Sequence, residues 1–202
     1  MNTNKQISAD FPFGSEYLEV YGSRIHFIDE GMGEPVLFLH GNPASSYIWR
    51  NIIPYISGGY RCIAPDLIGF GKSGKPDIAY SFEDHYKYIE RFTKKLGLRD
   101  ITLVVHDWGS ALGFYYAMKN ERYIKGIAFM EAFVKPLQWK ELAPKYCLGL
   151  KLARKPLLGW LSMQIVNGFV QFVMPLATQR KLSKAEKAAY RKPFQTIASR
   201  KP

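Results

Sequence analysis

Cysteine is scarce in this 202-residue chain, which contains only Cys62 and Cys147. The two form no Cys-x-x-Cys pair and no metal-type spacing with histidine, which argues against a zinc site and a disulfide framework and favours free thiols. Residues 1–10 lack an apolar stretch of signal-peptide length. The sequence therefore predicts a cytoplasmic protein, and its 47% hydrophobic content is enough for one substantial core.

Acidic side chains are scarce in the last third. Residues 135–202 hold 14 Lys and Arg but 2 Asp and Glu, whereas residues 1–134 hold 14 and 15, so the net charge of +11 belongs to the last third. No Gly/Arg-rich tract, recognition helix or aromatic RNA-binding pattern accompanies this charge. We interpret it as the surface of a cationic cap, or as one that meets acidic residues outside this chain, and we expect no nucleic-acid partner.

A phosphate-binding loop is also missing. The Gly-rich stretch Pro65–Gly74 follows a predicted strand, but it does not match Gly-x-x-x-x-Gly-Lys-[Ser/Thr]. No nucleotide cofactor and no metal is expected.

The chain is organised around Ile101–Ser110. An apolar, β-branched run stops at His106-Asp107-Trp108-Gly109 and a helical pattern follows, which predicts a strand, a tight turn and a helix. Such a turn lifts Asp107 above the sheet edge, as in the nucleophile elbow of α/β-hydrolases, and Gly109 gives the helix room. A carboxylate there attacks carbon and forms an alkyl ester that water must open. The alternative is that Asp107 only caps the helix.

Strand and helix patterns alternate over the first two-thirds of the chain. Strands are predicted at 17–21, 24–29, 35–40, 60–65, 101–107 and 124–130, and helices at 45–53, 81–97 and 109–120. This alternation predicts an α/β fold with a mostly parallel sheet and flanking helices. We expect a core at 1–134 and a helical cap domain at 135–202, with the boundary near Lys135-Pro136.

The run Leu157–Ala177 contains no charged residue, which meets the length rule for a membrane span. Its Gln, Asn, Gly and Pro residues weaken a lipid-facing helix, and basic residues flank both ends. Cap helices packed over the site are therefore favoured over a spanning helix.

Several motifs together resemble the haloalkane dehalogenases, from about Phe13 to the last residue. They are His40–Trp49, Asp66–Ser73, Val105–Gly113, Met130-Glu131 and Leu182–Phe194. The resemblance implies an α/β-hydrolase fold with a helical cap, and hydrolysis of carbon–halogen bonds to an alcohol and a halide. The implied reactants are a small apolar halogenated substrate and water, with no cofactor.

The resemblance also implies roles for four residues. Asp107 is similar to the nucleophile that displaces the halide and becomes esterified. Asn42 and Trp108 are similar to the pair whose side-chain N–H groups bind the leaving halide, and whose backbone amides form an oxyanion hole. Glu131 is similar to the carboxylate that orients the catalytic histidine. His40 and His106 are interpreted as structural.

One feature departs from the family. The four histidines, His26, His40, His85 and His106, all precede Glu131, whereas in α/β-hydrolases the base histidine follows the acid and a final strand. The sequence is therefore similar to the N-terminal two-thirds of a dehalogenase, as a partial record or a real truncation. We expect the strand at 124–130 to be an open sheet edge, and the chemistry to stop at the alkyl ester.

Three rival functions stay open. An epoxide hydrolase shares the elbow but needs cap tyrosines, for which only Tyr146 and Tyr190 follow Glu131. A coelenterazine-type luciferase retains nearly the same set of residues. A non-catalytic truncated paralogue with a basic interaction surface is the rival of another class. The sequence leaves the oligomeric state, substrate size and halide preference open.

Overall fold

The structure is a computed structural model that describes residues 7–135, 140, 151 and 155–201. A six-stranded sheet with the order β1-β2-β4-β3-β5-β6 forms its centre. The strands are β1 (Glu16–Val20), β2 (Ser23–Glu30), β3 (Pro35–Leu39), β4 (Arg61–Pro65), β5 (Ile101–Asp107) and β6 (Ile124–Ala132). The first two pairings, β1 with β2 and β2 with β4, are antiparallel, and the other three are parallel. The predicted strands are confirmed, and so is the hairpin.

Alternation along the central strands builds two apolar layers. In β3, Leu37 and Leu39 face one cluster, whereas Val36 and Phe38 face the other. β3 lies between β4 and β5 in the sheet, and both of its faces are covered by packed side chains, which explains its uninterrupted apolar sequence. Burying a side chain as large as Phe38 contributes about 2 kcal/mol to stability.

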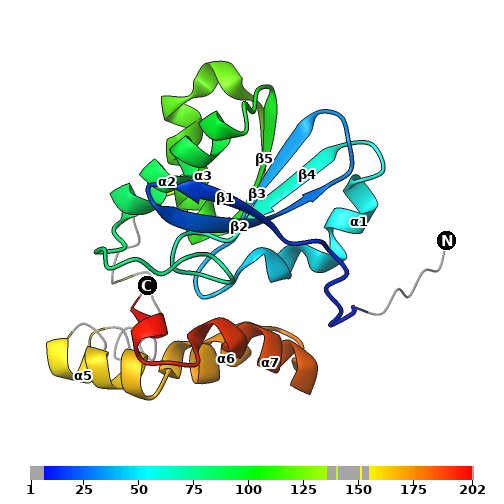
Figure 1. Cartoon of the computed structure of the whole chain (residues 1–202). Helices are drawn as coiled ribbons and strands as arrows, with labels where there is room; N and C mark the ends of the chain where they lie inside the picture. Colours follow the sequence, from blue (N-terminus) through cyan, green and yellow to red (C-terminus); the bar gives the residue numbers. More distant parts are fainter. Residues whose placement is uncertain (1–6, 136–139, 141–150, 152–154, 202) are drawn as a thin grey trace.

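Helices cover both faces, with α2 (Phe82–Lys95) and α3 (Trp108–Lys119) on one side of the sheet and α1 (Ile53–Ile56) on the other (Figure 1). The predicted capping box between Ser81 and Asp84 is present at the start of α2. Beyond its end, Gly97 has a φ of +64°, a conformation that glycine adopts without strain.

The single helix predicted at 45–53 is wrong in its extent. Ser45 caps it as expected, but a 3₁₀ turn, η1 (Ser46–Asn51), comes first and α1 starts anew at Ile53. Pro54 explains the break, because proline has no N–H to continue a helix but fits the first turn of a new one.

The described part of the last third, from residue 155 to 201, is mostly helical, as predicted, and lies as a layer across one end of the sheet domain (Figure 1). Its elements are α5 (Pro156–Trp160), the π-helical turns η4 (Leu161–Ile165) and η5 (Phe169–Val173), α6 (Met174–Ala177), α7 (Lys184–Arg191), and the 3₁₀ turns η6 (Lys192–Phe194) and η7 (Ala198–Arg200). Among the residues that the structure describes, no helix combines the length and the apolar character needed to cross a membrane. The expected boundary at Pro136, the tyrosine Tyr146 and the second cysteine, Cys147, lie outside the described residues. Cys62 is buried and free, as expected.

A buried ion pair and a buried aromatic side chain are among the contacts that join the helical layer to the sheet domain. Arg50 of η1 donates to Glu186 of α7 over 2.5 Å, and both side chains are almost fully buried. Phe194 is buried in the larger apolar cluster and packs edge-on against Phe70. The strand β6 forms one edge of the sheet, and within the described ranges no strand pairs with its outer side, as the sequence predicts.

Candidate functional site

The turn between β5 and α3 holds Asp107 in a strained conformation, with φ 52° and ψ −129°. Backbone angles of this kind are almost restricted to glycine and cost about 1–3 kcal/mol in other residues. Gly109 permits the turn, because a Cβ there would lie 2.2 Å from the carbonyl oxygen of Leu39. The predicted elbow is therefore present, and it raises the Asp107 side chain at the carboxyl end of the sheet.

The loop after β3 reaches the Asp107 carboxylate. The backbone N–H of Asn42 donates to Asp107 Oδ1 over 2.9 Å. Gly41 allows this approach, because a Cβ on it would lie 2.2 Å from the same oxygen. The Asn42 N–H therefore fixes one carboxylate oxygen, and the other has no partner in the described part of the chain.

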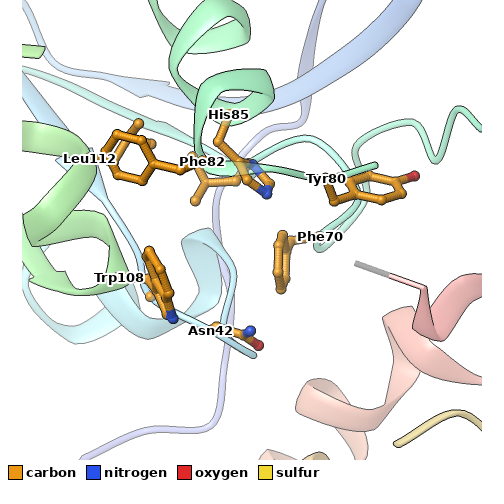
Figure 2. Close-up of a pocket in the computed structure, with 9 residues that line it drawn as sticks. Asn42, Phe70, Tyr80, Phe82, His85, Trp108 and Leu112 are labelled. Atoms are coloured by element: carbon orange, nitrogen blue, oxygen red, sulfur yellow. The ribbon is translucent and has the colours of Figure 1, made fainter. Parts of the chain in front are cut away.

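Asn42, whose backbone N–H meets this carboxylate, and Trp108, the residue after Asp107 in sequence, line one cavity with a volume of about 160 Å³. Asp107 itself is not among the residues that line it. The Trp108 side chain is 51% exposed, and its ring lies 6.4 Å from that of Phe82 and 6.1 Å from that of Phe133. Figure 2 shows the indole nitrogen at the end of the Trp108 ring nearer to Asn42. The site thus offers an amide N–H and an indole N–H next to a carboxylate.

The remaining wall of the cavity consists mostly of apolar and aromatic side chains. They are Leu67, Phe70, Tyr80, Phe82, His85 and Leu112. Burial lowers the pKa of His85 to about 4, so its imidazole is neutral at pH 7. Its Nδ1 is buried and has no hydrogen-bond partner among the residues that the structure describes. A cavity of this kind takes a small apolar molecule.

Glu131 lies at an irregularity near the end of β6. His106 pairs with Met130 and Asp107 with Ala132, so Glu131 bulges out, with a φ of +47°. Its side chain is 82% exposed and accepts a hydrogen bond from His106 Nε2 over 3.2 Å. The sequence assigned His106 no part in the site, whereas the structure pairs it with the expected acid.

His40 has the structural role expected from the sequence. It is fully buried, its Nδ1 donates to the carbonyl oxygen of Gly41, and its Nε2 accepts from the N–H of Leu67. Burial lowers the pKa of this imidazole, which keeps it neutral. His40 therefore fixes the loop that carries Asn42.

Two further residues near the cavity and the elbow, His85 and Ser110, are not among the site residues inferred from the sequence. His85 lies three residues after Phe82 and four before Ile89, on the helix face that points to the core, so its spacing marks it as inward-facing. Ser110 donates to the carbonyl oxygen of Asp107 over 2.5 Å and accepts from the N–H of Phe133. It follows the elbow directly, but no sequence pattern indicates that second contact.

The described ranges contain no group of three or more His, Cys, Asp or Glu side chains arranged to hold a metal ion. The groups at this site suit displacement at carbon better than chemistry at a metal. They are a fixed carboxylate, two N–H donors and a mostly apolar wall.

Comparison with known proteins agrees with this geometry. Residues 34–151 match the profile of the alpha/beta hydrolase fold family. A haloalkane dehalogenase of Mesorhizobium japonicum is 44% identical over 189 residues, which are 92% of this chain and 61% of that protein. One from Sphingobium indicum is 45% identical, over 91% of this chain and 64% of that protein.

A solved structure gives the same result. The crystal structure of the haloalkane dehalogenase DbeA from Bradyrhizobium elkani superposes with a TM-score of 0.91 and 41% identity, over 94% of this chain and 67% of that one. The chain spans 61–64% of the length of the curated relatives it matches. The profile match covers more than half of the chain, so this protein belongs to the alpha/beta hydrolase fold family, in which the relatives it matches are haloalkane dehalogenases.

Proposed function

We propose that this chain carries the carbon–halogen-cleaving site of a haloalkane dehalogenase. Asp107 is the nucleophile, Asn42 and Trp108 bind the leaving halide, and Glu131 orients the base of the second step. The observation that carries the proposal is the Asp107 carboxylate, held in a strained turn against the Asn42 N–H beside a mostly apolar cavity. The names of the matched relatives support it.

The first step is a displacement at carbon. Asp107 Oδ2 attacks the carbon that bears the halogen, the carbon–halogen bond breaks, and the halide leaves with the bonding electron pair. Because negative charge grows on the halogen, the side-chain N–H groups of Asn42 and Trp108 stabilise the transition state more than the neutral substrate. The product is an alkyl ester of Asp107.

The second step is hydrolysis of that ester. Water attacks the Asp107 carbonyl carbon and the alcohol leaves, while the backbone N–H of Asn42, already 2.9 Å from Oδ1, stabilises the oxyanion. A base must take the proton from water, and in this proposal Glu131 orients the histidine that does so. All four histidines of the 202 residues precede Glu131. We therefore expect these residues to release about one halide per chain and to stop at the ester.

The test is a stoichiometric incubation of the 202-residue chain with 1-bromobutane. We expect bromide to reach one equivalent per chain, measured by ion chromatography, and the peptide with Asp107 to gain a butyl group by mass spectrometry. Asp107→Asn should release none, and Asp10→Asn, at an exposed aspartate far from the elbow in sequence, should match the unmodified chain. Unmodified Asp107 with no bromide would refute the proposal, and sustained turnover would refute the expected stop at the ester.

The rival enzymes differ in what they require. An epoxide hydrolase needs cap tyrosines that protonate the epoxide oxygen. Tyr190, the candidate that the structure describes, packs edge-on against Tyr47 and is not among the residues that line the cavity. A coelenterazine luciferase would emit light with that compound, which a luminometer detects directly. A paralogue that only binds an acidic partner would leave Asp107 unalkylated. The domain division at 135 and the cytoplasmic location stay predictions.

A further inference from the structure

A hydrogen-bonded chain of Asp, His and Ser side chains lies outside the set of residues that line the cavity beside Asn42 and Trp108. Asp66 Oδ2 is 2.8 Å from Nδ1 of His26, and Nε2 of His26 is 3.1 Å from Oγ of Ser15. Both distances fall within the range of about 2.6–3.2 Å that joins nucleophile and base in hydrolases. His26 and Asp66 are 0% and 1% exposed, whereas Ser15 is exposed.

The proton positions follow from the partners. Burial acts to raise the pKa of Asp66, but the hydrogen bonds that its carboxylate accepts from His26 and from the Lys72 N–H help to hold that pKa below its usual range. An ionised Asp66 can only accept, so His26 Nδ1 carries the proton and donates it. His26 Nε2 is then free to accept the hydroxyl proton of Ser15. This is the tautomer that a serine nucleophile requires.

The fold fixes the base and the acid rigidly. His26 lies in β2 and Asp66 directly follows β4, its antiparallel neighbour. Asp66 also accepts the backbone N–H groups of Ser46 and Lys72, each over 2.7 Å. Ser15 immediately precedes β1, which pairs with β2 on the other side. The three side chains therefore come from three neighbouring segments of the sheet.

The ammonium group of Lys72 lies next to the Ser15 hydroxyl. Lys72 Nζ donates to Ser15 Oγ over 2.7 Å, which places an ammonium group within reach of an oxyanion that forms next to Oγ. Two aromatic rings flank the group. The Tyr17 ring lies 5.4 Å from His26, and Lys72 Nζ lies 5.5 Å from the centre of the Phe11 ring.

We propose that Ser15 is the nucleophile of a second, acyl-transferring site, with His26 as general base, Asp66 as its orienting carboxylate, and aryl esters as the substrate class. Ser15 Oγ bonds to the ester carbonyl carbon as its proton passes to His26 Nε2. The carbon–oxygen bond to the aryloxide then breaks, and His26 returns the proton to that leaving group. Water, deprotonated by His26, releases the acid and restores Ser15.

The test uses the 202-residue chain and diisopropyl fluorophosphate, which forms a bond from serine oxygen to phosphorus with loss of fluoride. Peptide mass spectrometry reads each serine separately, so the result does not depend on whether Asp107 reacts. Ser81 is the internal control, since it is exposed and its hydroxyl donates to Asp84 with no imidazole between them. We expect Ser15 to be labelled about 100-fold faster than Ser81. Equal rates, or labelling at Tyr17 instead, would overturn the proposal.

Variants provide a second measurement, hydrolysis of p-nitrophenyl acetate. We expect Ser15→Ala to lose the esterase activity about 100-fold, and Ser81→Asn, which keeps a good helix cap, to retain it. His26 is fully buried, so its replacement risks the fold, and Lys72→Met at the surface is the better probe. It should slow Ser15 labelling about tenfold with an unchanged circular dichroism spectrum, and Lys72→Arg should restore the rate. Unchanged activity in Ser15→Ala would overturn the proposal.

Discussion

The Asp107 carboxylate is suited to displacing a halide from carbon, but the residue has backbone angles that favour glycine. Its φ of 52° and ψ of −129° put it where only glycine is relaxed. Asp107→Gly should therefore raise the free energy of unfolding by about 1 kcal/mol, while bromide release falls to zero. Urea unfolding followed by circular dichroism measures the first, and ion chromatography the second.

Asp107→Asn is the matched control for that change, because it removes the charge but keeps a β-carbon in the same strained turn. It should abolish bromide release with little gain in stability. Equal stability of the Gly and Asn variants would contradict the view that strain is stored in this turn.

His85 is a second single residue with a predictable effect, because it makes the free energy of unfolding depend on pH. Burial lowers its pKa to about 4 from the ordinary value of 6.5, so the folded state binds fewer protons than the unfolded state between these pH values. The stability from neutral His85 is fully present above pH 6.5 and is lost as the pH falls towards 4. His85→Phe should flatten the loss by on the order of 2 kcal/mol, measured by urea unfolding at several pH values.

Some pH dependence should persist in that variant, because burial also lowers the pKa of His40. A His85→Phe variant that loses stability as steeply as the unmodified chain would show that His85 stays accessible to protons in the folded state.

Among the secondary-structure elements, the close packing of α3 against β3 determines whether the turn at Asp107 can form. A Cβ on Gly109 would lie 2.2 Å from the Leu39 carbonyl oxygen, a backbone atom that cannot move aside without shifting β3. Gly109→Ala should therefore lower the free energy of unfolding by about 3 kcal/mol. Gly126→Ala is the control, because its Cβ would meet nothing within 4 Å and should change stability little. Equal effects in thermal unfolding would show that α3 adjusts freely.

The elements were predictable because local patterns determine them. A few neighbouring residues determine the alternation of buried side chains in β3, the capping box of Ser81 and the end of the apolar strand β5 at Asp107. The split of the helix at Pro54 could have been read from that proline. The Glu131 bulge and its bond to His106 could not, because they depend on how β5 and β6 align in register.

In the molecule as a whole, a buried ion pair joins the helical layer to the sheet domain. Glu186 is nearly fully buried, and the hydrogen bond from Arg180 lowers its pKa to about 2. Arg50, 136 positions away in sequence, donates to the same carboxylate. Glu186→Gln leaves Arg50 buried without a counter-charge and should cost about 3 kcal/mol of stability.

The control for that change is Glu83→Gln. It breaks an exposed pair with Lys87 on one turn of α2, which is worth less than about 0.5 kcal/mol. Thermal unfolding measures both variants. Similar melting temperatures for the two would mean that the helical layer contributes little to the folded state.

In the part of the chain that the structure describes, the outer side of β6 is unpaired, and this has a practical consequence. Its backbone N–H and C=O groups can accept a strand from a separate polypeptide. Given the proposed reaction of Asp107, a peptide that adds such a strand and places a histidine against Glu131 would supply the base for ester hydrolysis and allow repeated turnover. The chain could then serve as one half of a complementation reporter, in which continuous bromide production signals that two pieces have met.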